Sequence, residues 1–131
     1  MPSRFENWFE KAKQNAYVFN EQDGIVEFYL HILIDKEHDL FTAHCLEFDL
    51  VADGSTIEQV QKDIMDVCRE HIVHCFDNKH LEYLLDFAPK EYWRQFYDCH
   101  KKKPKKPYQE SYPSYPRFLK EVNFAQCPVY A

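Results

Sequence analysis

Cysteine and histidine residues at helical spacing are the first groups in this sequence that could do chemistry. Four of them fall within residues 68–75: Cys68, His71, His74 and Cys75. Intervals of three and four positions can turn two ligands toward one zinc ion, and His44 and Cys45 lie on a separate apolar segment. Most of the four also coincide with an apolar helical stripe, where a free cysteine packs as a small hydrophobe. We therefore predict that they pack in the core and that the chain binds no metal or cofactor.

Nucleophilic or acid–base catalysis would need a different set of partners. Cys45 could act as a nucleophile, but its neighbour His44 points to the opposite face of a strand and cannot serve directly as its base. His71 or His74 could reach it instead. Carboxylates that could serve a metal-dependent enzyme are plentiful: Asp35, Glu47, Asp49 and Asp53. Because their spacing does not make them converge, we predict no catalytic residue and a function other than catalysis.

Glycine is scarce, and its scarcity excludes several enzyme classes. The chain of 131 residues contains only Gly24 and Gly54, whereas average composition would give about nine glycines. Two isolated glycines cannot build a P-loop, a dinucleotide-binding loop or a nucleophile elbow. Mononucleotide kinases, Rossmann dehydrogenases and α/β-hydrolases are therefore excluded.

Charge is distributed unevenly along the chain. Residues 1–97 hold nine basic and nineteen acidic groups, a net of −10, and residues 98–131 hold seven basic and three acidic groups, a net of +4. The second segment also contains five of the seven prolines. We expect an acidic domain over residues 1–97, followed by a basic tail rich in proline and tyrosine over residues 98–131.

The basic run of this tail is a candidate nucleic-acid site. Its lysines precede several tyrosines, and cations combined with stacking surfaces are typical of RNA or DNA binding: Lys101, Lys102, Lys103, Lys105 and Lys106. The alternatives are a solvated linker and a tail that folds back on the acidic domain.

Localisation follows from two further features. The sequence has no apolar run approaching ~18 residues and no charged leader before an apolar segment. The five cysteines are odd in number and lack the spacing of a disulfide framework. We expect a cytoplasmic protein with reduced thiols and no membrane contact.

The order of elements predicts an α+β fold of two layers. Apolar spacing predicts an amphipathic helix over residues 4–16, strands over 25–35 and 40–46, and a less regular extended piece over 47–52. Capping residues Ser55 and Thr56 then open a long helix that runs to residue 76. A short helix follows Pro89, and residues 117–125 can form a final strand at an edge of the sheet. The predicted core is a three-stranded antiparallel sheet packed on the long helix.

Two motifs within residues 25–76 resemble a known family. They are Ala43-His44-Cys45-Leu46-Glu47-Phe48 and Gly54-Ser55-Thr56-Ile57-Glu58-Gln59-Val60. Placed after two strands and at the start of a long helix, they are similar to the HicB-like antitoxin domain of bacterial type II toxin–antitoxin systems. The chain lacks the proline and glycine of the usual loop in that family, and its last third shows no ribbon-helix-helix or helix-turn-helix module.

The resemblance implies a non-catalytic domain that covers a small basic RNA-cleaving toxin and associates with itself through its sheet. An acidic domain would attract such a partner. Aromatic residues are also in surplus, and such residues are enriched at interfaces. The predicted partner-binding residues are three carboxylates and three aromatic residues of the short helix: Glu47, Asp49, Asp53, Tyr92, Trp93 and Phe96. Nucleic-acid binding or regulation through the Lys-rich tail is the alternative function.

Overall fold

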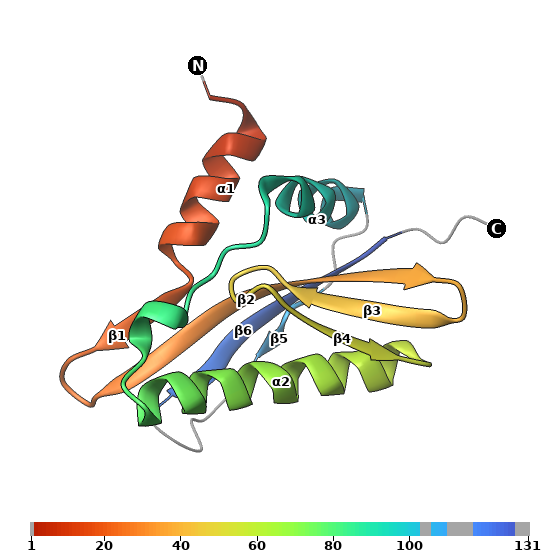
Figure 1. Cartoon of the computed structure of the whole chain (residues 1–131). Coiled ribbons are helices and arrows are strands. Elements are labelled where there is room, and N and C mark those ends of the chain that lie inside the picture. Colours follow the sequence, from red (N-terminus) through yellow and green to blue (C-terminus); the bar gives the residue numbers. More distant parts are fainter. Residues whose placement is uncertain (1, 103–105, 110–116, 128–131) are drawn as a thin grey trace.

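The chain folds around one mixed β-sheet that has helices on both faces. The computed structural model describes residues 2–102, 106–109 and 117–127. Within these residues the sheet has six strands in the order β4-β3-β2-β6-β5, and β1 pairs with β2 outside this path. One face of the sheet carries α2, and the other carries α1 and α3 (Figure 1). The long central strand β2 therefore contributes to both layers of side-chain packing.

The first third of the chain forms α1 (Arg4–Gln14), β1 (Tyr17–Asn20) and β2 (Ile25–Glu37). Ser3 caps α1 by accepting a hydrogen bond from the backbone N–H of Glu6 at 3.1 Å, as helix N-termini require. Gly24 closes the turn between β1 and β2 with a φ of +71°, a conformation that glycine adopts without strain. β1 is antiparallel to the first residues of β2, and the sequence pattern had not indicated it.

The middle of the chain forms β3 (Leu40–Cys45), β4 (Leu50–Gly54) and α2 (Ile57–Asp77). Thr56 is the N-cap of α2, and its hydroxyl accepts from the N–H of Gln59 at 3.1 Å. A Cβ atom on Gly54 would lie 3.1 Å from the backbone nitrogen of Val60. The absent side chain therefore lets the end of β4 approach the first turn of α2 closely.

The last third forms the short 3₁₀ helix η1 (Leu81–Tyr83), α3 (Lys90–Lys102), β5 (Tyr108–Gln109) and β6 (Arg117–Gln126). β6 lies beside β2 and runs parallel to it, with a register shift after Phe28. β5 pairs with the other side of β6 in the antiparallel sense. The final strand is thus confirmed, but it lies between β2 and β5 and not at an edge.

The architecture differs from the predicted sheet in a way that the chain order explains. The prediction of a three-stranded antiparallel sheet under one helix was wrong in its detail. β6 pairs with β2 in parallel, and a second layer of helices covers the other face of the sheet. Parallel neighbours need a long crossover connection. Here it comprises everything between β2 and β6, which local periodicity cannot reveal. The broader α+β class holds.

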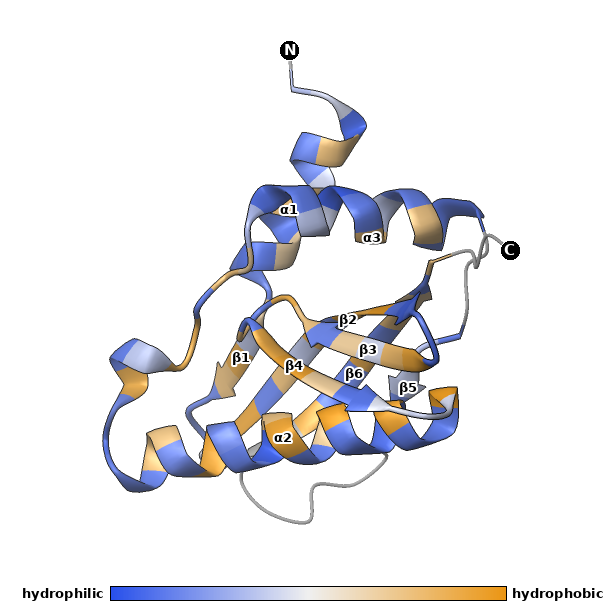
Figure 2. Cartoon of the chain, turned by 45° about the vertical axis from the view of Figure 1, so that its right-hand side comes forward, coloured by the Kyte–Doolittle hydropathy of each residue, from blue (hydrophilic) through white to orange (hydrophobic). Residues whose placement is uncertain are grey.

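Two separate apolar cores hold the layers together. The first lies between α2 and the sheet, where Ile64, Cys68 and Ile72 pack on strand residues such as Leu30 and Ile32; apolar residues recur along α2 in Figure 2. The second lies between the sheet and the other two helices and is mostly aromatic: Phe5, Phe9, Trp93 and Phe96 with Leu33, Leu46, Ala88 and Ala125. The aromatic surplus is thus accounted for largely by a second core. Among the described residues, no helix is both long and apolar enough to cross a bilayer.

Candidate functional site

The six residues predicted to bind a partner divide into buried and exposed groups. Glu47, Trp93 and Phe96 are core residues, with exposed fractions of 0%, 0% and 2%. This corrects their assignment to a partner surface, since none of them has area to offer in this fold. The indole Nε1 of Trp93 donates to the backbone carbonyl of Ala88 at 3.1 Å, which satisfies its polar atom internally.

The other three residues come together around one acidic cleft of about 480 Å³. Asp49 and Tyr92 line this cleft. Asp53 accepts a hydrogen bond at 2.9 Å from the hydroxyl of Thr42, which is a lining residue. The full lining is Leu33, Asp35, Glu37, Thr42, His44, Asp49, Val51, Pro89, Tyr92 and Gln95. These described residues include three carboxylates and no Lys or Arg.

Strand pairing explains why these side chains share a face. Asp35 is the partner of Thr42 in the β2–β3 ladder, and Thr42 is the partner of Asp53 in the β3–β4 ladder. Residues directly opposite in antiparallel strands project to the same side of the sheet. The start of α3 supplies Tyr92 above them. The acidic cleft is therefore formed by the β2–β3–β4 end of the sheet and by α3.

One wall of the cleft is held by a histidine–carboxylate pair. The Nε2 atom of His44 lies 2.6 Å from Oδ1 of Asp49. The His44 ring packs edge-on against the ring of Tyr92, with the ring centroids 4.9 Å apart. Asp49 has a φ of +53°, which Asp tolerates better than most residues. These contacts fix His44 while the Asp49 side chain stays 39% exposed, so a carboxylate oxygen remains accessible to a ligand.

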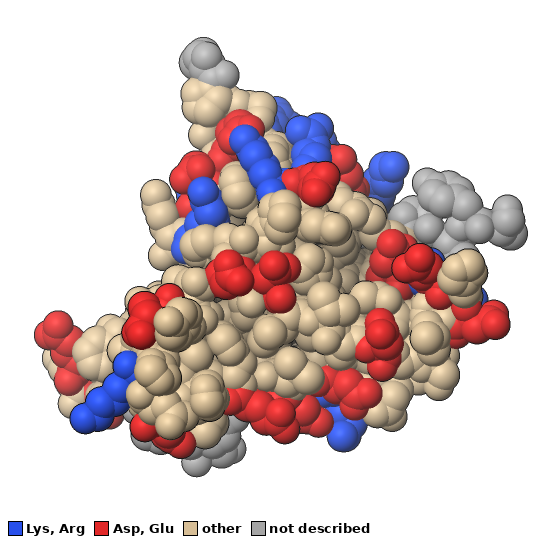
Figure 3. Space-filling model, in the orientation of Figure 1, with Lys and Arg blue, Asp and Glu red and all other residues tan. Residues whose placement is uncertain are grey.

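The charge on the outer surface is unevenly distributed. In Figure 3, carboxylates dominate along α2 and at the β2–β3 end of the sheet, whereas most visible Lys and Arg side chains lie over α1 and α3, mixed with carboxylates. Asp35 and Glu37 belong to the exposed end of β2. The acidic cleft thus opens at an acidic end of the molecule, where the surrounding field favours a cation.

The basic run lies only partly within the described residues. Lys101 and Lys102 are exposed in the last turn of α3, where positive charge complements the helix dipole. Lys106 is exposed just before β5. Lys103 and Lys105 lie outside the described residues. Nucleic-acid binding by this run therefore stays a prediction.

Two of the four candidate metal ligands lie in the first core, whereas His71 is half-buried and His74 is exposed. Cys68 and Cys75 are buried in this core, and burial raises the pKa of the Cys75 thiol, with a further contribution from the charge of Glu82. The Nε2 of His71 donates to the carbonyl of Leu84 at 2.9 Å. No group of three or more His, Cys, Asp or Glu side chains with metal-binding geometry is found within the described part of the chain.

Sequence reasoning missed a second histidine–carboxylate pair, formed by His31 and Glu47. Both oxygens of Glu47 are used: Oε1 accepts from the backbone N–H of His31 at 2.8 Å, and Oε2 lies 2.6 Å from Nδ1 of the same residue. The His31 ring packs against Trp8, Trp93 and Phe96. A glutamate between Leu46 and Phe48 in an apolar run was the available signal, because a fully buried Glu is rare unless it is paired.

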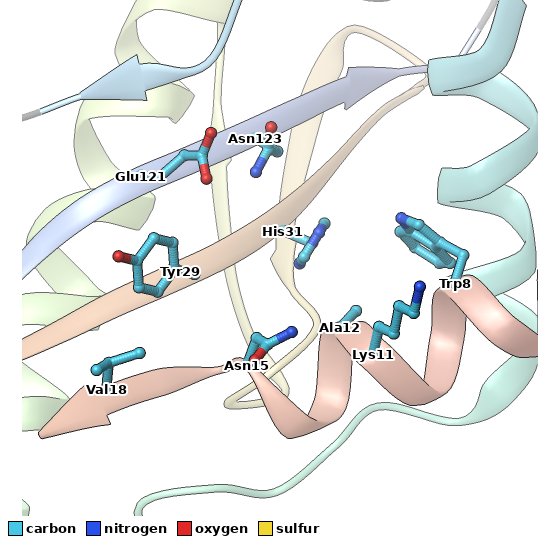
Figure 4. A pocket seen from close by; sticks show the side chains of 9 residues that line it. All are labelled: Trp8, Lys11, Ala12, Asn15, Val18, Tyr29, His31, Glu121 and Asn123. Atoms are coloured by element: carbon cyan, nitrogen blue, oxygen red, sulfur yellow. The ribbon is translucent and has the colours of Figure 1, made fainter.

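His31 also lines a second cleft of about 480 Å³, between α1 and the sheet. Figure 4 shows its side chains: those of α1 lie on one side, and those of β2 and β6 lie on the other. This surface, which we call the histidine cleft, is lined by Trp8, Lys11, Ala12, Asn15, Val18, Tyr29, His31, Glu121 and Asn123. It shares no residue with the acidic cleft.

Comparison with known proteins adds no relative to this description. The chain matches no protein-family model, no curated protein and no solved structure at a significant level.

Proposed function

We propose that this protein is a non-catalytic binding domain whose acidic cleft receives a basic protein. The observation that carries the proposal is the convergence of Asp35, Glu37 and Asp49 on one cavity that has no Lys or Arg among its described lining residues. Basic side chains would find both a charge partner and the ring of Tyr92 there. Arg and Lys pair with carboxylates and also stack on aromatic faces.

The surface around the cleft favours a protein partner over a small ligand, because exposed apolar side chains and a strand edge adjoin the carboxylates. Apolar side chains at its margin are exposed, with Val51 at 53% and Leu40 on the adjacent strand end at 49%. An apolar contact ringed by charge is the usual composition of a protein interface. β4 is also an end strand of the sheet path. Its outer edge pairs with no other described strand, and a strand of another chain could pair with it.

The HicB-like resemblance gives this proposal its specific form. The partner would be a small basic toxin that cleaves RNA, and binding at the acidic cleft would neutralise it. A net charge of −10 over residues 1–97 would raise the rate of association with such a protein. Self-association through the sheet belongs to the same proposal.

The test is to co-express the chain with the product of the small basic reading frame adjacent to its gene. We expect the two proteins to co-purify, and we expect the chain to restore growth in cells that the second protein inhibits. Absence of such a reading frame, or a neighbouring product that neither inhibits growth nor binds, would contradict the antitoxin role.

A charge variant of the cleft sharpens this experiment. Replacing its three carboxylates (Asp35→Asn, Glu37→Gln and Asp49→Asn) should abolish growth rescue. The matched control removes three exposed carboxylates near the far end of α2 and in η1 (Glu70→Gln, Asp77→Asn and Glu82→Gln) and should rescue like the wild type. Equal rescue by both variants would place the partner elsewhere.

Nucleic-acid binding through the Lys-rich run is the alternative. It predicts salt-dependent RNA or DNA binding, because each neutralised phosphate releases counterions. Deletion of residues 99–107 should then abolish binding, whereas the acidic-cleft variant should leave it unchanged. Binding that survives the deletion would contradict this alternative.

A further inference from the structure

The histidine cleft contains a side chain that is rigidly positioned and still accessible. Glu47 holds His31 through both the backbone N–H and the ring Nδ1. Because an ionised carboxylate only accepts hydrogen bonds, Nδ1 carries the hydrogen, and Nε2 is the ring atom left for another partner. The His31 side chain is 13% exposed. A buried carboxylate that orients an accessible imidazole is an arrangement found at functional sites.

Other polar groups in the cleft also lack partners within the described structure. The ammonium of Lys11, the amide of Asn123 and the carboxylate of Glu121 make no side-chain hydrogen bond or ion pair there. These groups come from α1 and β6, while His31 comes from β2. One cavity is thus faced by these three side chains and by Nε2 of His31, and none of these groups has a side-chain hydrogen bond to another described residue.

The cleft is electrically polar along its length. In Figure 4, Glu121 and Tyr29 lie on one side of His31, and Trp8 and Lys11 lie on the other. Burial raises the pKa of the Tyr29 phenol, and its hydrogen bond to Glu27 and the charge of Glu121 act in the same direction. One end of the cleft is therefore anionic and the other is cationic. Each end also carries an aromatic side chain, Tyr29 beside Glu121 and Trp8 beside Lys11.

We propose that the histidine cleft binds a small zwitterion, a free amino acid or dipeptide with an apolar or aromatic side chain. The ammonium of the ligand pairs with Glu121 and donates to Nε2 of His31, and its carboxylate lies at Lys11. Its apolar side chain packs on Trp8 or Tyr29. A cavity of about 480 Å³ falls in the size range of small-molecule sites. A zwitterion pairs with both charged groups, whereas an anion pairs with Lys11 alone and a cation with Glu121 alone.

Three related probes test this assignment: L-phenylalanine, 3-phenylpropionate, which lacks the ammonium, and phenethylamine, which lacks the carboxylate. Binding is followed on the full chain by chemical-shift changes of backbone and side-chain amides. L-phenylalanine should shift Asn123 and its cleft neighbours and bind on the order of tenfold more tightly than either analogue. No shift at the cleft with amino acids or dipeptides, or equal binding of all three probes, would overturn the proposal.

Two substitutions in the cleft test separately how the carboxylate and the ammonium of the ligand are recognised. Lys11→Ala should weaken L-phenylalanine and 3-phenylpropionate but leave phenethylamine unchanged. Glu121→Gln should weaken L-phenylalanine and phenethylamine but leave 3-phenylpropionate unchanged. Lys13→Ala is the control, since Lys13 pairs with Glu10 and does not line the cleft. Uniform weakening by all three variants would show that the ends of the cleft do not recognise charge and would overturn the proposal. Neither cleft variant touches the acidic cleft, so the outcome is independent of the proposed protein partner.

Discussion

The Nδ1 atom of His31 lies 2.6 Å from Oε2 of Glu47, and this contact ties the middle of β2 to the loop between β3 and β4. Glu47 is wholly buried, and Leu46 in the same loop donates its backbone N–H to the carbonyl of His31 at 3.0 Å. The loop is thus fastened to β2 by side-chain and backbone contacts together. This arrangement positions Asp49, which follows in the loop, at the mouth of the acidic cleft.

Removing the charge of Glu47 should therefore destabilise the fold. Glu47→Gln leaves one acceptor oxygen for two donors, and the unsatisfied group costs about 1–3 kcal/mol. Asp49→Asn is the matched control: it breaks a contact of the same length to His44, but the carboxylate is 39% exposed, so the cost should stay below about 1 kcal/mol. Urea denaturation measures both free energies. Equal losses would contradict the structural role assigned to Glu47.

Adjacent aromatic residues on α3 should respond very differently to truncation. Trp93 is fully buried in the second core and Tyr92 is 37% exposed. Trp93→Ala should cost about 3–5 kcal/mol because it leaves a large cavity. Tyr92→Ala should cost under about 1 kcal/mol in the free protein. Thermal denaturation of the two variants decides this. A mild effect of Trp93→Ala would mean that this residue does not belong to the core.

Two thiols are placed for a disulfide. The Sγ atoms of Cys99 on α3 and Cys127 after β6 lie 3.5 Å apart. Burial, together with the neighbouring Cys99 thiol, raises the pKa of Cys127 to about 12, so the Cys127 thiol does not readily form the reactive thiolate. A small disulfide oxidant should link the two residues with loss of two thiol hydrogens and stabilise the fold by about 2–4 kcal/mol.

Mass spectrometry after non-reducing digestion reads out this bond. Cys99→Ser should abolish it, whereas Cys75→Ser should not, because Cys75 lies in the other core. Failure of the wild type to form the 99–127 link under oxidant would refute the expectation.

Mild acid should weaken the fold through His100. Burial lowers the pKa of this imidazole, and the charge of His31 lowers it further; its Nε2 is buried without a partner in the described structure. The unfolded chain then binds more protons near and below its ordinary pKa of about 6.5, so stability rises with pH in that range and falls on acidification. The denaturation midpoint should drop less between about pH 7.5 and about pH 5.5 in His100→Gln than in the wild type. An identical drop would exclude this contribution.

Local sequence signals predicted the elements better than their assembly. The capping hydroxyl of Thr56 and the apolar spacing after it located α2, and alternation located β2, because both signals depend on neighbours within a few residues. β1 was missed since its four residues, Tyr17–Asn20, are all exposed and show no alternating burial. The parallel pairing of β6 with β2 depends on contacts between residues about ninety positions apart, which no short window contains.

The residues of the candidate site could also be predicted only in part from local sequence signals. Asp49, Asp53 and Tyr92 were predicted from charge and aromatic content, and the sheet register brings them to one cleft with Asp35 and Glu37. Trp93 and Phe96 carry the same sequence signal as Tyr92. Their direction on α3 depends on a second core that becomes visible only when the helices are placed on the sheet.

The most direct measurement of the central claim is the affinity of the chain for the small basic protein proposed as its partner, across a range of ionic strengths. We predict that the wild type loses affinity as salt rises, since opposite charges dominate the encounter. The variant that lacks the carboxylates of Asp35, Glu37 and Asp49 should bind at least about tenfold more weakly and depend less on salt, while the Glu70, Asp77 and Glu82 control binds like the wild type. Wild-type affinity in the first variant would contradict the acidic cleft as the binding site.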